Sequence, residues 1–285
     1  MLCARGDSFA FISVLQENCM RTYLLLLFLV VFLFVGCGKR SAGDVSLIKR
    51  NGFVTVMTNA AFPPYEYLDE NGMPCGIDID IAQRVANELG VKLNVRNVSF
   101  DYVFKGVADG YADFGISAIT ITEGRQKNIA FSNPYFETNQ CLLLLEGNDV
   151  ANFEELAGKA IGACHGTTGY AFLEKQIGEG VLADSHTLLV PFENAEDSFP
   201  MLRRRKLAAM LVDEAAAIKF ARDNQGMHYL PLRMKDGKAV SEKYGVIALP
   251  QNNLLIDVIN SVIEKMQKDG SLTQSFEYHE EHKVK

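Results

Sequence analysis

The amino-acid sequence predicts an α/β fold, in which strands and helices alternate along the chain. Three observations support this prediction. Short runs of β-branched and aromatic residues recur, as at residues 53–57, and segments with apolar residues at helical spacing separate them. Glycine follows several of the helical segments. Strand–helix–strand units of this length indicate parallel sheets with right-handed crossovers.

The first half of the chain holds one complete α/β unit. Residues 78–89 have apolar side chains at helical spacing and are followed by Gly90, which predicts a helix and its C-cap. Asn71-Gly72 is a turn signal that joins two short extended pieces. The elements predicted here besides the helix are strands at 53–57, 91–95 and 112–117, extended pieces at 66–68 and 76–77, and a short helix at 101–110.

A second α/β unit begins near residue 141. Its predicted strands are 141–145, 160–163 and 208–212, and its predicted helices are 153–156, 168–175, 197–205 and 213–223. A C-terminal piece follows, with a strand at 244–249, a long amphipathic helix at 254–268 and a short final helix. This piece has too few strands to form a domain by itself.

Size and charge limit the possible functions. With 285 residues, the chain is long enough for one large domain or for two medium-sized lobes with cores of their own. The formal net charge of -7 argues against sequence-independent nucleic-acid binding, which depends on an excess of Lys and Arg. The sequence contains no Trp, so any ring that stacks on a ligand must come from Phe or Tyr. We expect a monomer with no nucleic-acid partner.

The N-terminal 36 residues read as a targeting signal. An apolar run at 23–35 follows Arg21 and precedes Gly36 and Cys37, which is the pattern of a secretory signal. The end of this run resembles a bacterial lipobox, although Phe34 stands where that pattern usually has Leu. We therefore expect cleavage after Gly36, a lipid such as palmitate on Cys37, and anchoring to the membrane through that lipid.

An uncleaved membrane anchor is the alternative reading of this signal. The apolar run is shorter than the roughly 20 residues that a spanning helix needs, which favours cleavage. The segment at 37–49 is then a tether, and the rest of the chain lies outside the cytoplasmic membrane, in the periplasm or at the cell surface. Residues 1–19 show no signal pattern, so Met20 is a candidate for the true start.

The cysteines do not indicate a metal site or a disulfide framework. Beyond Cys37, the mature chain keeps Cys75, Cys141 and Cys164, and three thiols cannot all pair with one another. There is no Cys-x-x-Cys pair and no His at zinc-ligand spacing from them. We expect neither a cofactor nor a metal.

Four motifs carry a resemblance to a known family. In chain order they are TNAAFPPYEY at 58–67, GIDIDIA at 76–82, SAITITEGR at 117–125 with IAFSNPY at 129–135, and GTT at 166–168. With these motifs in this order, residues 52–276 resemble the extracellular solute-binding proteins of polar amino acid ABC transporters. This resemblance covers nearly the whole mature chain.

The resemblance implies a two-lobed, type II periplasmic-binding-protein fold, in which each lobe is a central sheet flanked by helices. Lobe 1 is then formed by residues 50–137 and 235–285, and lobe 2 by residues 140–232. Two strands join the lobes as a hinge. This arrangement would explain why the C-terminal piece has too few strands of its own.

The resemblance also implies a ligand cleft whose first feature is a carboxylate site. Arg125 matches the arginine that binds the ligand carboxylate, a role that suits its planar, bidentate fork. Ser117 and Thr120 lie on the preceding turn, where hydroxyl and N–H groups can donate to the same carboxylate. The alternatives are an ion pair of Arg125 with Glu123 on a surface turn, and ordinary helix caps for the two hydroxyl residues.

Lobe 2 contributes two groups on the same basis. Thr167 and Thr168 open a helix whose N-terminus can hold an anion, with Thr168 reaching the ligand carboxylate. Asp213 follows the strand at 208–212 and matches the aspartate that takes the ligand ammonium. For Thr168 and Asp213 the alternative is a simple N-cap.

The remaining positions concern the ligand side chain. Phe62 and Phe100 match two aromatic residues that sandwich it, with core packing as the alternative, and Tyr65 is placed at the rim. Asn59 matches a position that is Asp in relatives that bind basic amino acids, which favours a neutral polar or acidic ligand. Ala118 replaces a Ser found in some relatives.

Two further features leave alternatives open. His165 is either a donor to the far end of the ligand or an ordinary loop histidine. The basic run at 203–206 is either a solvated helix end or a surface that docks on a permease.

We therefore expect a non-enzymatic lipoprotein that binds an amino acid by closure of its lobes and delivers it to the permease of an ABC transporter. One alternative is an enzyme on the same fold that resembles cyclohexadienyl dehydratases, with Glu66 or His165 as the acid. The other is a ligand-sensing module.

Overall fold

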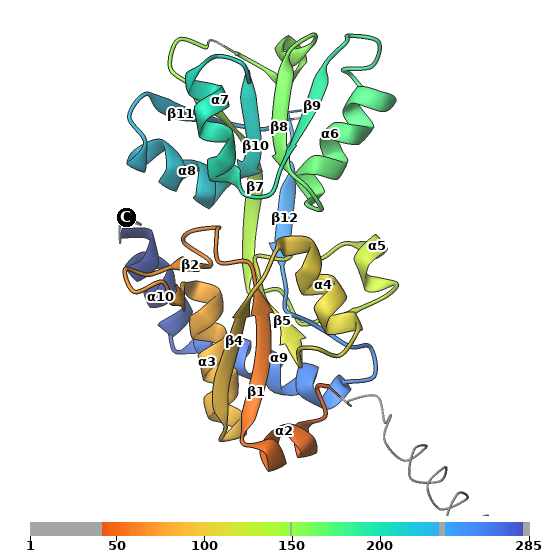
Figure 1. Ribbon diagram of the computed structural model, residues 1–285, viewed down its shortest axis with the longest axis vertical. Coiled ribbons are helices and arrows are strands. Elements are labelled where there is room, and N and C mark those ends of the chain that lie inside the picture. The colour runs from red at the N-terminus through yellow and green to blue at the C-terminus, as the bar shows by residue number, and fades with distance from the viewer. Residues whose placement is uncertain (1–41, 149, 234–236, 282–285) are drawn as a thin grey trace, which may run out of the picture. The chain divides into compact units, whose positions relative to one another are not determined.

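The computed structural model describes residues 42–148, 150–233 and 237–281 (Figure 1). The predicted signal region, Cys37 and most of the predicted tether lie outside these residues. Among the residues described, no helix combines the length and apolar character that a membrane span requires.

The first sheet has five strands in the order β4-β1-β5-β13-β6. Strand β1 is parallel to both β4 and β5, whereas β13 is antiparallel to β5 and β6. The C-terminal segment thus supplies a strand to the sheet that the N-terminal segment begins. The strands are β1 Phe53–Thr58, β4 Lys92–Asn97, β5 Phe114–Gly115, β6 Ala130–Phe131 and β13 Ile247–Ala248.

Six helices and a small hairpin accompany this sheet. The amphipathic helix α3, Ile77–Leu89, buries its apolar face and ends at Gly90, which adopts the left-handed conformation with φ 71°. It packs against the two C-terminal helices, so distant parts of the chain share one core. The other elements are α2 Val45–Asn51, α4 Phe100–Ala108, α5 Glu123–Gln126, α9 Asn253–Lys268, α10 Ser271–Glu281, and the hairpin β2 Tyr67–Leu68 with β3 Pro74–Cys75.

The second sheet has the order β11-β7-β10-β8-β9. Leu142 and Leu144 of β7 pack into the core on one face, and Cys141 and Leu143 into the core on the other, as the two-residue period of a strand requires. Its strands are β7 Phe136–Leu145, β8 Ala160–Cys164, β9 Leu188–Phe192, β10 Ala209–Asp213 and β11 Met227–Pro231. Its helices are α6 Thr168–Gly178, α7 Phe199–Arg203, α8 Glu214–Asp223 and the 3-10 turns η1 Phe153–Leu156 and η2 Ala195–Ser198.

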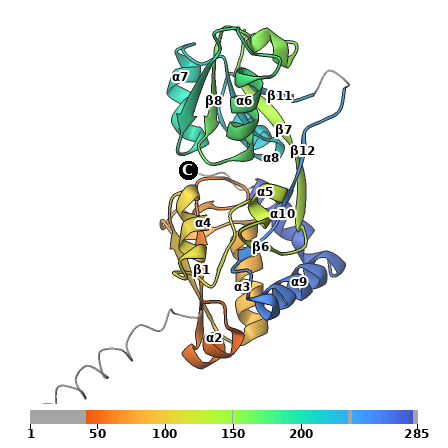
Figure 2. The same ribbon diagram turned by 90° about the vertical axis from the view of Figure 1, so that its right-hand side faces the viewer.

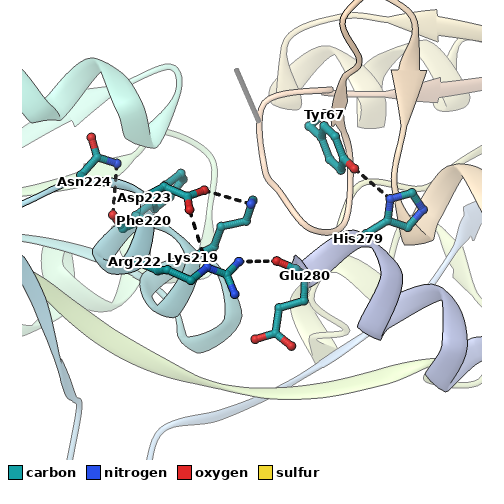
Figure 3. Close-up of polar contacts among 8 residues, drawn as sticks. All are labelled: Tyr67, Lys219, Phe220, Arg222, Asp223, Asn224, His279 and Glu280. Carbon is teal, nitrogen blue, oxygen red and sulfur yellow. Dashed lines mark hydrogen bonds and ion pairs between the residues drawn. The ribbon is translucent and has the colours of Figure 1, made fainter. Parts of the chain in front are cut away.

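Two antiparallel strands connect the two sheets (Figures 1 and 2). Strand β7 pairs through residues 136–139 with β12, Ser241–Tyr244, and through residues 140–145 with β10 and β11. Away from these strands, α8 and α10 also touch, because the guanidinium of Arg222 donates to the backbone carbonyl of Glu280 (Figure 3).

The structure changes several element predictions. Both sheets are mixed rather than parallel, because β13 and β7 run against their neighbours. Strands β9 and β11 were not predicted. They are edge strands that contain Pro191 and Pro231, and proline in a short run argues against a strand. The strand expected at 244–249 is two strands, β12 and β13, and the helix expected at 197–205 is a 3-10 turn followed by α7.

Candidate ligand-binding site

A pocket with about 630 Å³ of empty space lies between the edges of the two sheets. Ten of the twelve side chains predicted to bind the ligand line it, and Tyr65 and His165 do not. The lining from the first sheet and its loops is Asn59, Ala61, Phe62, Glu66, Phe100, Ser117, Ala118, Thr120 and Arg125. The lining from the second is Gln140, Cys164, Thr167, Thr168, Gly169, Glu193, Asn194, Ala195, Leu211, Val212 and Asp213.

Arg125 is held by backbone carbonyls rather than by a carboxylate. Its Nη1 donates to the carbonyl of Thr120 at 2.8 Å and its Nη2 to the carbonyl of Gly166 at 2.9 Å, so it bridges the two halves of the pocket. Its guanidinium lies over the ring of Phe104, 4.8 Å from the centroid. Burial lowers the pKa of Arg125, and Glu242, Asp213 and Asp101 oppose that shift. The alternative ion pair with Glu123 is not formed.

The turn before α5 presents two hydroxyl groups that do not cap that helix. The N-cap of α5 is Thr122, whose hydroxyl accepts from the backbone N–H of Arg125 at 3.1 Å. Ser117 instead accepts from the backbone N–H of Asn59 at 3.0 Å, and Thr120 donates to Glu242 at 2.6 Å. Helix capping therefore does not explain why these two hydroxyls lie in the pocket wall.

Two adjacent threonines at the start of α6 line the pocket, and one of them caps the helix. Thr167 is the N-cap, and its hydroxyl accepts from the backbone N–H of Tyr170 at 3.1 Å. The hydroxyl of Thr168 is left to face the other half of the pocket, where it lies 3.4 Å from that of Thr120.

Asp213 stands at the N-cap position of α8 but makes no capping hydrogen bond. Its carboxylate accepts from the side-chain amide of Gln140 and from the hydroxyl of Tyr244, two groups on the connecting strands. Burial, then the charge of Glu242, raises the pKa of Asp213 well above its ordinary value, against the effects of Gln140 and Arg125.

Two of the three predicted aromatic residues lie in the pocket wall. Phe62 and Phe100 are both half-buried, and the edge of Phe100 packs on Phe104. Tyr65 is not at the rim. It is fully buried between Phe62, Phe136 and Tyr244, because apolar groups surround it on the inner side of its segment.

The positions predicted to set specificity are also placed. Asn59 lines the pocket, and its side-chain amide donates to the carbonyl of Val98 at 3.0 Å. Ala118 lines the pocket in the left-handed region, with φ 43°. His165 is outside the lining and mostly exposed, with Nδ1 2.7 Å from a carboxylate oxygen of Asp101.

The prediction of the binding site missed Glu66, the most deeply buried carboxyl group in the pocket wall. Its side chain is 1 % exposed, Oε1 accepts from the hydroxyl of Ser117 at 2.8 Å, and Oε2 has no hydrogen-bond partner. Burial raises the pKa of Glu66 well above its ordinary value, and nearby Asp78 adds to the shift. The sequence placed Glu66 in a short extended piece, where alternation alone does not tell which residue faces a pocket.

Comparison with known proteins finds a matching family and similar solute-binding proteins. Residues 54–280 match the family model of the bacterial extracellular solute-binding proteins, family 3. The probable histidine-binding protein of Neisseria gonorrhoeae is 27% identical over 75% of this chain and 78% of its own length. The L-cystine-binding protein TcyJ of Escherichia coli K12 is 27% identical over 86% of this chain and 90% of its own length.

Solved structures give the same fold. The Gly52Ala mutant of arginine-bound ArgBP from T. maritima superimposes with a TM-score of 0.70 at 31% identity, over 78% of this chain and 100% of that one. The predicted two-lobed α/β fold is thereby confirmed. All three relatives are described by the solute they bind rather than by a reaction. This chain belongs to the bacterial extracellular solute-binding proteins, family 3.

Proposed function

We propose that this protein captures a free amino acid in the pocket between its two sheets and presents it to the permease of an ABC transporter. One observation carries the proposal. A single pocket contains the guanidinium of Arg125 and two hydroxyls on one half, and the hydroxyl of Thr168 and a carboxylate at a strand end on the other, which complements the two charges of an amino acid zwitterion.

The carboxylate of the ligand is assigned to Arg125, Ser117, Thr120 and Thr168. The guanidinium is already oriented by two carbonyls and an aromatic face, so little side-chain entropy is lost on binding. Thr168 comes from the opposite half of the pocket, so its hydrogen bond to the ligand would stabilise the closed form.

The ammonium of the ligand is assigned to Asp213. This carboxylate is enclosed by protein, and its neighbours include Glu242, which disfavours its charge in the empty pocket. An ammonium group supplies the missing positive charge. Phe62 and Phe100 flank the ligand side chain and contribute contact area with little geometric selectivity.

The balance of charge in the pocket favours a cationic side chain. Within the described part of the chain, the pocket lining has one basic residue, Arg125, against Glu66, Glu193 and Asp213. A ligand carboxylate offsets Arg125 and an ammonium offsets Asp213, which leaves the buried Glu66 without a counter-charge. Of the three relatives named above, the arginine-bound and the histidine-binding protein are described by ligands of this class, and the L-cystine-binding protein is not. The preference for a neutral or acidic ligand rested on Asn59 alone and did not include Glu66.

The predicted location of the protein would allow it to deliver its ligand to the permease. Lipidation of Cys37 would hold the protein at the outer side of the cytoplasmic membrane or at the cell surface, and the closed form would dock on the permease as a monomer. The enzyme alternative assigned an acid role to Glu66 or His165, and of these two residues Glu66 lines the pocket and His165 does not.

A thermal-shift screen of residues 38–285 against the twenty amino acids, with prephenate as a control ligand, tests the proposal. Binding raises the melting temperature by mass action, and the largest shifts are expected with arginine, lysine or histidine. A shift with prephenate and with none of the amino acids would replace this proposal by the dehydratase alternative.

A further inference from the structure

Two buried carboxyl groups lie together beneath the turn that holds the ligand. Glu66 is 1 % exposed and Asp78, in the first turn of α3, is fully buried. Gly76 brings them together, because a Cβ there would lie 2.2 Å from the carbonyl oxygen of Tyr65. Only glycine allows this approach, which seats the start of α3 against the segment that carries Glu66.

The pair supports the turn directly. The carboxylate of Asp78 accepts from the backbone N–H of Ala118 at 2.7 Å and from the hydroxyl of Tyr135 at 2.8 Å. Glu66 accepts from Ser117 through Oε1 only. Asp78 is thus fully provided with donors, whereas Oε2 of Glu66 lacks one.

Among the residues that the structure describes, no cation acts on the pKa of either carboxyl group. The titratable groups that influence Glu66 and Asp78 are each other, Tyr65, Tyr135 and Asp213, all neutral or acidic. Burial raises the pKa of Asp78 to about 6 and that of Glu66 well above its ordinary value. Two like charges this close in a water-poor site do not both ionise, so the pair keeps a proton.

The proton belongs on Glu66. Asp78 already accepts two hydrogen bonds as a carboxylate, which favours its charged form. A proton on Oε2 of Glu66, donated to Asp78, provides the partner that this buried oxygen lacks, and the two carboxyls interact in this sense.

We propose that Glu66 and Asp78 share one proton in the empty pocket, and that the cationic end of a ligand side chain displaces this proton when it docks on Glu66. The O–H bond of Glu66 breaks, the proton passes to solvent, and the resulting carboxylate pairs with the ligand cation. This inference rests on the proposed class of ligand. If the proton is displaced in this way, the affinity for a basic ligand falls at low pH. Basic ligands release a proton on binding, whereas neutral ligands do not.

The test is isothermal titration calorimetry of residues 38–285 with L-arginine in phosphate and in Tris at the same pH. The difference in heat between buffers gives the protons exchanged, and release of about one proton is expected. The affinity should fall about tenfold for each pH unit of acidification below the pKa of the pair, as linkage of one proton requires. Arginine binding without proton release overturns the inference.

Two variants locate the proton. Glu66→Gln keeps the shape and can still donate to Asp78, so it should reduce the release by about one proton. Glu174→Gln removes an exposed carboxylate on α6 outside the pocket lining and should leave the release unchanged. Unaltered proton release in Glu66→Gln would assign the proton elsewhere, with Asp213 as the first candidate, and would refute the inference.

The ligand-free protein gives an independent measurement. Infrared spectra at neutral pH should contain a protonated carboxyl band that Glu66→Gln lacks, and absence of this band overturns the shared proton whatever the ligand. If the band is present but only neutral amino acids bind, the cationic ligand class fails, and the release step fails with it. If no amino acid binds at all, the proposed function itself is wrong.

Discussion

The two ends of the pocket differ in how well they stabilise charged groups when no ligand is bound. At one end, Arg125 keeps its charge without a ligand, because two carbonyl dipoles and an aromatic ring stabilise it. At the other end, burial raises the pKa of Glu66 and of Asp213, and the charge of Arg125 only partly offsets the shift of Asp213. Arg125 is therefore charged before the ligand carboxylate binds, whereas Glu66 and Asp213 ionise most easily once a ligand is in place.

Removing the guanidinium of Arg125 should have the largest effect on ligand binding. Arg125→Ala leaves the ligand carboxylate without its bidentate partner, so the binding free energy should weaken by about 2–5 kcal/mol. Titration calorimetry measures this change, and Arg125→Lys, which keeps the charge but not the fork, should lose less. Near-normal affinity in Arg125→Ala would contradict the carboxylate assignment.

The opposite end should be less sensitive to a neutral replacement. Asp213→Asn keeps the shape and an acceptor oxygen but not the charge, so the loss of binding free energy should be about 1.5–3 kcal/mol, the range for hydrogen bonds to charged groups. The same calorimetric titration measures it. Equal losses for Asp213→Asn and Arg125→Ala would mean that the two ends do not differ in the way described.

The raised carboxyl pKa values should also appear in the stability of the empty protein. For Asp78 the pKa rises from 3.8 when unfolded to about 6 when folded, so between these values the folded state binds more protons. Stability should therefore fall as pH rises through this window, by up to about 1.4 kcal/mol per pH unit for each such group. Asp80, whose pKa is lowered, acts in the opposite sense and mainly below pH 4.

Urea unfolding of the ligand-free protein between pH 4 and pH 7 measures this dependence. Glu66→Gln should flatten the slope, because it removes one member of the pair. A free energy of unfolding that rises steadily with pH across the window would refute the assignment of buried, uncompensated carboxyls.

Two adjacent threonines give the smallest and most selective comparison. Thr168→Val removes the pocket hydroxyl and should weaken binding by about 1 kcal/mol. Thr167→Ala removes the N-cap of α6 and should lower the free energy of unfolding by about 1 kcal/mol, with less effect on affinity. Thermal unfolding and calorimetry on both proteins separate the two roles. A larger affinity loss in Thr167→Ala would reverse them.

The sequence predicted much of this arrangement but not all of it. Helix α3 and the strongly apolar strand β7 were found because their periodicity is clear, and Arg125 because its motif is specific. Tyr65 and Glu66 show the limit. Tyr65 lies in the turn that follows Pro63-Pro64, and Glu66 follows it directly, so no strand or helix period states which of the two side chains faces the pocket. Tyr65 was predicted at the rim of the pocket, whereas Glu66 lines the pocket and Tyr65 is fully buried.

Two further features of the pocket were beyond the same reasoning. That Thr167, and not Thr168, caps α6 depends on the exact turn of backbone at the start of the helix. That Asp213 is engaged by Gln140 and Tyr244 depends on where the connecting strands cross the pocket. Neither partner is close to Asp213 in the sequence, and no local sequence pattern predicts these two hydrogen bonds.

The path of β7 has a consequence for how such a protein can be recombined. The backbone N–H of Leu232 donates to the carbonyl of Gln140 at 2.8 Å, and the N–H of Gln140 donates to the carbonyl of Val240 at 2.8 Å. The second sheet therefore enters and leaves the first at one point, as a nested insert with adjoining ends. Exchanging it for that of a relative requires two splice points a single hydrogen bond apart, so half of the pocket can be transplanted without interrupting the other half.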